Sequence, residues 1–68
     1  MPRYYVNKTA QASGDHEVHT ETCIFLPVEW NRIYLGQFGS CAEAVREAKK
    51  IYRQSDGCAT CSKACHTR

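Results

Sequence analysis

The chain has 68 residues, a formal net charge of +2 and a hydrophobic fraction of 43%. This length allows one domain, and folding at this size buries only about 60% of the surface that the unfolded chain exposes. Domains this small usually gain stability from a metal ion or from disulfide bonds. No stretch approaches the roughly 20 apolar residues of a membrane helix, so we expect no membrane-spanning segment.

Five cysteines are the candidates for such a cross-link. An odd number leaves one thiol over in a framework made only of disulfides, and the N-terminal residues show no apolar run typical of a signal peptide. These features predict a reducing, cytoplasmic location, where thiols stay free or bind metal. A disulfide-stapled miniprotein without metal is the alternative interpretation.

The N-terminal half predicts short strands. Residues 4–7 favour a first strand, and residues 16–19 can return as the second arm of a hairpin, because Gly14 supplies the flexible backbone that a hairpin loop favours. Residues 32–35 predict a third strand.

A helix follows the predicted strands. Ser40 and Glu43 form a capping-box pattern, in which the serine accepts a hydrogen bond from a free amide at the helix start. Apolar residues then recur at helical spacing: Cys41, Ala44, Val45, Ala48, Ile51 and Tyr52. We expect the helix to end at Gly57.

Two pairs of metal-ligating residues flank the third strand and the helix. His19 and Cys23 form an HxxxC motif, and Cys58 and Cys61 form a CxxC motif. Short spacing within each pair lets both side chains reach one ion, and the long gap between the pairs makes the ion a cross-link. The resulting Cys3His set predicts a structural zinc site, because the protein fills all four positions of a tetrahedron.

Other residues leave alternatives open. Cys65 and His66 follow the CxxC motif, and either could replace His19 as the fourth ligand. Cys41 falls on the apolar face of the helix, where a free cysteine behaves as a small buried hydrophobe. His16 is an odd number of residues from His19, which places the two on opposite faces of a regular strand, so we expect a surface histidine outside the site.

These elements together predict an α+β fold. A short antiparallel sheet of two or three strands packs on one helix, is stabilised by zinc and is followed by a C-terminal CxxC knuckle. A single zinc-binding domain spans 1–68, with residues 1–3 and 67–68 expected to fray.

The HxxxC pair, the sequence Asn-Arg-Ile-Tyr at 31–34, the serine-started helix and the final Gly-Cys-x-x-Cys resemble the Ada-type metal-binding domain. This domain occurs in bacterial DNA alkylation-repair proteins and as a zinc module appended to some nucleases. The resemblance covers about residues 18–61 and implies a zinc-binding α+β module with DNA among its partners. It also implies that the zinc ligands are His19, Cys23, Cys58 and Cys61.

Two departures separate the chain from that family. The repair proteins use the first cysteine of the first pair as a methyl acceptor, and His19 occupies that place here, which counts against methyl transfer. Ser55 and Asp56 replace the proline-containing turn of the family. The N-terminal segment and the terminal Cys-His are more similar to a group of short stand-alone bacterial proteins, a resemblance that implies no activity.

The opposite face of the predicted helix carries a basic stripe, made of Arg46, Lys49, Lys50 and Arg53. We therefore expect a monomeric zinc-binding module, not an enzyme, that has no small-molecule substrate and contacts nucleic acid or an acidic protein through this stripe. Trp30 or Tyr34 could stack on a base. The alternative is a thiol-based redox or alkyl-acceptor protein that uses the CxxC motif.

Overall fold

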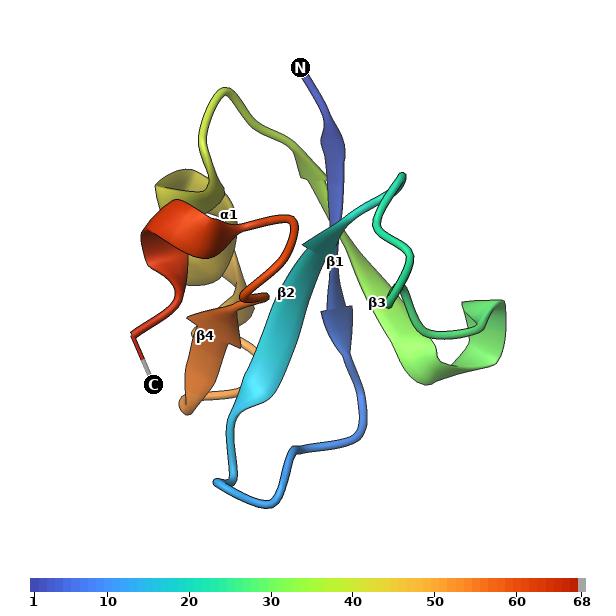
Figure 1. Ribbon diagram of the computed structural model, residues 1–68, viewed down its shortest axis with the longest axis vertical. Coiled ribbons are helices and arrows are strands. Elements are labelled where there is room, and N and C mark those ends of the chain that lie inside the picture. Colours follow the sequence, from blue (N-terminus) through green and yellow to red (C-terminus); the bar gives the residue numbers. More distant parts are fainter. Residues whose placement is uncertain (68) are drawn as a thin grey trace.

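The computed structural model describes residues 1–67 and contains a four-stranded mixed sheet and one α-helix (Figure 1). The strands are β1 (Arg3–Asn7), β2 (His16–Thr20), β3 (Arg32–Gln37) and β4 (Ser55–Gly57), the helix is α1 (Cys41–Ala48), and the 3-10 turns are η1 (Glu29–Asn31) and η2 (Lys63–Cys65). The strand order is β3-β1-β2-β4. The α+β class is confirmed, but the sheet has one strand more than expected and is not purely antiparallel.

Strands β1 and β2 form the predicted N-terminal hairpin. Val6 pairs with Val18 in antiparallel register, and Gly14 in the connection has a φ of 93°. Glycine adopts this left-handed conformation without the steric penalty that a Cβ brings. The predicted third strand is also present as β3, which pairs antiparallel with β1.

The core lies between one face of the sheet and α1. Tyr4 and Val6 of β1 and Val18 of β2 pack against Ala44 and Ala48 of the helix. The alanines are small, so the helix lies close to the strands. Few buried side chains form this core, which explains why the fold needs cross-links.

Helix α1 begins where the sequence predicts. The hydroxyl of Ser40 accepts a hydrogen bond from the Glu43 amide at 3.5 Å and donates to the Glu43 carboxylate at 3.3 Å. The helix ends at Ala48, however, well before the predicted end at Gly57. The chain turns there, and the ring of Tyr52 stacks on the ring of His16 at a centroid distance of 3.7 Å.

Strand β4 was not predicted from the sequence. It runs parallel to β2, with Val18 opposite Gly57, and the amide of Cys58 donates to the Val18 carbonyl at 3.0 Å. Ser-Asp-Gly has neither apolar alternation nor β-branched residues, so its local sequence does not favour a strand. Pairing with β2 places Cys58 beside the strand that carries His19.

A disulfide bond joins Cys41 at the start of α1 to Cys65 in η2. The interpretation of Cys41 as a free buried thiol is therefore wrong. The bond closes a loop with a sequence separation of 24, for which chain entropy predicts a stabilisation of about 3 kcal/mol. In Figure 1, α1 and the red C-terminal turn accordingly lie together on the left of the sheet.

Both ends of the described chain make contacts. Arg3 already belongs to β1, and its guanidinium lies 3.4 Å from the Glu21 carboxylate. The amide and hydroxyl of Thr67 donate to the carboxylate of Asp56, whereas Arg68 lies outside the described residues.

Within residues 1–67, no helix has the length and apolar character needed to cross a membrane.

Candidate metal centre

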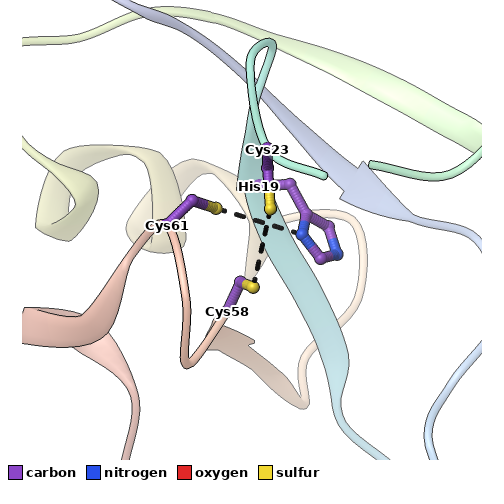
Figure 2. Close-up of side chains that lie close together, drawn as sticks. All are labelled: His19, Cys23, Cys58 and Cys61. Carbon is purple, nitrogen blue, oxygen red and sulfur yellow. Dashed lines mark hydrogen bonds between the residues drawn. The ribbon is translucent and has the colours of Figure 1, made fainter. Parts of the chain in front are cut away.

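The structure brings the four predicted ligands together. His19 comes from β2, Cys23 from the turn that follows it, and Cys58 and Cys61 from the loop after β4 (Figure 2). One potential ligand atom from each residue lies within 4.8 Å of all the others. The Sγ atoms of Cys23 and Cys58 are 3.9 Å apart, and Cys61 Sγ is 4.0 Å from His19 Nδ1. This cluster can hold a metal ion.

Tight turns set the spacing within each cysteine segment. The amide of Cys23 donates to the Thr20 carbonyl at 3.2 Å, and the chain curls back directly after β2. The amide of Ser62 donates to the Cys58 carbonyl at 2.9 Å, which closes a single turn around the CxxC motif. Both turns are local, and each brings together the two ligands of one closely spaced pair.

Each sulfur of the cluster also accepts a hydrogen bond from a backbone amide. The amides of Phe25, Thr60 and Thr20 donate to the sulfurs of Cys23, Cys58 and Cys61 at 3.4, 3.4 and 3.3 Å. Hydrogen bonds to a sulfur favour its thiolate form, and the thiolate is the form that binds metal. Backbone amides thus surround three sulfurs that could bind a metal ion.

His19 is the most enclosed member of the cluster, with 1% of its side chain exposed. Burial lowers the pKa of its imidazole, which keeps the ring neutral and able to bind a metal ion. Its Nδ1 atom faces the sulfurs, whereas Nε2 points away from them (Figure 2). Nε2 is buried and has no hydrogen-bond partner among the described residues, an arrangement that costs about 1–3 kcal/mol.

The thiols of the cluster differ in acidity. The pKa of Cys23 is raised to about 12, mainly by burial; the Phe25 amide lowers it in part, and the neighbouring Cys61 and Cys58 raise it. Burial also disfavours the thiolate of Cys61, but hydrogen bonds from the Thr20 amide, Cys23 and Ser62 outweigh it and lower the pKa of Cys61. Negative charge therefore collects on Cys61 before Cys23, and three adjacent thiolates would need a cation between them.

The alternative ligands lie outside the cluster. Cys65 is in the disulfide bond, and Nδ1 of His66 donates to the Gly57 carbonyl at 3.0 Å. His16 is also outside the cluster, as expected, and its Nδ1 donates to the Asn7 carbonyl at 2.9 Å. Its ring is half-buried against Tyr52, however, so it is not the surface side chain that the sequence predicted. Three of the five cysteines belong to the cluster, which leaves two that can pair with each other. The sequence interpretation missed this signal for a disulfide bond.

The predicted basic stripe is exposed, but it is not one helix face. Of its four residues only Arg46 belongs to α1, because the helix ends at Ala48; the other three occupy the turn and bend that follow. The Lys50 ammonium lies 3.1 Å from the Glu47 carboxylate, which offsets part of the positive charge. What remains is a basic surface at the C-terminal end of the helix, made of Arg46, Lys49, Lys50 and Arg53.

No protein-family model matches the chain, and comparisons with curated proteins and with solved structures give no match either. The function must therefore be argued from the site. Three thiols and one imidazole converge on one point, and all four belong to the chain.

Proposed function

We propose that the chain is a small zinc-binding module whose single site is structural. The observation that supports this most directly is the environment of the cluster. Every sulfur accepts a hydrogen bond from a backbone amide, and burial keeps the imidazole neutral. Cys23, Cys58 and Cys61 act as thiolate ligands and His19 acts as the nitrogen ligand. The ion supplies positive charge that stabilises three adjacent thiolates.

The types of ligand atom and the distances between them favour zinc. Soft sulfur ligands with one imidazole select zinc over hard cations such as magnesium and calcium. A tetrahedron with zinc–sulfur bonds of about 2.3 Å has edges of about 3.8 Å. The separation of 3.9 Å between the sulfurs of Cys23 and Cys58 is close to that value. A sulfur–nitrogen edge with a zinc–nitrogen bond of about 2.0 Å is about 3.5 Å, and Cys61 Sγ and His19 Nδ1 lie 4.0 Å apart.

The proposed role of the ion is to hold the fold together. Protein ligands fill all four positions, so no position stays open for water or a substrate, and we propose no catalytic activity. The ion joins β2, the connection between β2 and β3, and the loop after β4. In a domain with so small a core, metal binding contributes directly to folding.

Metal content and thiol reactivity test this proposal together. Purified protein should contain one zinc ion per chain by elemental mass spectrometry. A chelator should expose the three thiols of the cluster, and a reductant should then expose the two that form the disulfide. A protein that lacks zinc, or whose thiols react equally with and without chelator, contradicts the proposal. A redox role of the CxxC motif predicts instead that reductant, and not chelator, exposes Cys58 and Cys61.

The proposed partner of the module is nucleic acid, bound through the basic surface. All four cations of this surface are exposed, and they gather where the helix dipole is negative and already favours positive side chains. Exposed lysine and arginine side chains are sufficient to contact the phosphates of a nucleic acid, whatever its sequence. The resemblance of the ligand motifs to the Ada-type domain, in which DNA is a partner, supports the same choice.

A further inference from the structure

The buried Nε2 atom of His19 has one acidic group close to it. Glu17 and His19 are alternate residues of β2, so their side chains extend from the same face of the strand. The Glu17 carboxylate lies 3.7 Å from Nε2, slightly beyond hydrogen-bond distance, and 15% of its side chain is exposed. A carboxylate that is mostly withdrawn from water thus lies beside an N–H group that needs an acceptor.

The surroundings leave room for this hydrogen bond to close. A cavity of about 230 Å³ adjoins the site and is lined by Gln11, Glu17, Phe25, Cys58, Ala59 and Thr60. Glu17 forms part of the wall of this cavity, so its side chain is not packed on every side. A movement of less than about 1 Å brings it to the distance of a charge-assisted hydrogen bond.

We propose that Glu17 is a positioning residue of the zinc site, which accepts a hydrogen bond from His19 Nε2 and thereby holds Nδ1 toward the ion. This inference rests on the proposed function. Histidines that bind metals usually donate their second ring N–H to a carboxylate or a carbonyl, which fixes the tautomer and the orientation of the ring. The hydrogen bond also satisfies the one described buried side-chain polar atom that lacks a partner.

Zinc affinity, measured by competition with a chromophoric chelator, gives the first test. Glu17→Ala should bind zinc about 10-fold to 100-fold more weakly than the wild type. Glu29→Ala removes an exposed carboxylate in η1 and serves as the matched control, which should stay within about twofold. Equal affinities of Glu17→Ala and Glu29→Ala would overturn the inference.

The nitrogen resonances of His19 give a second readout that general destabilisation would not reproduce. In the zinc-bound wild type, a long-range proton–nitrogen spectrum should show Nδ1 bound to metal and the proton on Nε2. Glu17→Gln keeps the shape of the side chain and a weaker acceptor, so it should stay folded, shift the Nε2 proton resonance upfield and exchange that proton faster with water. A ring bound through Nε2, or an unchanged Nε2 proton in Glu17→Gln, contradicts the inference. A wild type without zinc contradicts the proposed function itself.

Discussion

Gly57 occupies a point where a side chain would not fit. A Cβ atom there would lie 2.6 Å from the Cβ of Cys65 and 2.7 Å from the carbonyl oxygen of Ser62. Carbon atoms that are not bonded to each other do not approach so closely, so a larger residue must push η2 away from β4. The backbone of Gly57 also leads directly into Cys58, a proposed metal ligand.

Gly57→Ala should therefore lower the free energy of unfolding by about 2 kcal/mol, the range measured for overpacked sites. Zinc affinity should fall as well, because Cys58 is displaced with the strand. Urea unfolding and chelator competition measure the two effects. Gly39→Ala is the matched control, since a Cβ at Gly39 would meet its nearest atom at an ordinary 3.7 Å. Equal stability of the two variants would show that η2 does not lie on Gly57 in solution.

The raised pKa of Cys23 predicts a pH dependence of metal binding. With a pKa of about 12, this thiol holds its proton near neutral pH in the metal-free chain, and zinc must displace that proton. Apparent zinc affinity should therefore rise with pH between about 6 and 8, by up to about tenfold per pH unit for each proton displaced. Calorimetry in two buffers of different ionisation enthalpy counts the released protons. An affinity that does not change with pH would mean that the thiols are already ionised.

At the scale of elements, the proposed zinc ion should fix the connection between β2 and β3. Cys23 anchors its first part, and near its end Arg32 donates to the Pro27 carbonyl at 2.9 Å. Its apolar side chains contribute little, since Ile24 is 82% exposed and Trp30 is 79% exposed. Without zinc, this connection should lose its fixed conformation before the hairpin does.

Hydrogen exchange with and without chelator checks this expectation. Amides of residues 21–31 and 58–62 should exchange much faster after zinc removal, whereas those of β1 and β3 should change less. Cys58→Ser should reproduce the effect of the chelator and, because metal binding and folding are coupled, should leave the domain largely unfolded at elevated temperature. Uniform loss of protection across all strands would show that the ion supports the whole sheet equally.

The disulfide should make a separate contribution. The double variant Cys41→Ala/Cys65→Ala should keep its zinc and lose about 3 kcal/mol of stability, because the bond constrains the unfolded chain and contains no cluster residue. Thermal unfolding and metal content of the same sample measure both. Loss of zinc from this variant would mean that the disulfide is needed to hold the CxxC segment in place.

The elements that the sequence predicted correctly are those with local causes. The start of α1 follows from Ser40 and Glu43, and the approach of the two ligands within each pair follows from the two short spacings. The end of α1 and the presence of β4 depend on Ser55–Gly57 pairing with β2, a contact between distant segments that leaves no periodicity in the sequence. The disulfide likewise joins residues 24 apart, and Cys41 was assigned from its helical position alone.

At the scale of the whole molecule, the proposed nucleic-acid contact predicts a strong dependence on salt. If all four cations of the basic surface contact phosphates, the logarithm of the affinity should fall with the logarithm of salt concentration, with a slope of about −3.6 for duplex DNA and about −2.8 for a single strand. Lys49→Glu and Arg53→Glu should each weaken binding to a fluorescent oligonucleotide and reduce the slope. Lys8→Glu, an equal charge change in the hairpin connection, should do so far less. Binding that does not respond to salt would exclude this surface as a phosphate contact.

The segment from Cys58 to Cys65 is attached to the rest of the molecule twice, by bonds that need opposite chemical conditions. Its first two cysteines could hold the proposed ion only while they are reduced, and its last holds α1 only while it is oxidised. Strong oxidants should therefore detach the segment from β2, and strong reductants should detach it from the helix. We therefore expect both attachments of this segment to be present together only within a window of ambient redox potential, and the width of that window can be measured directly.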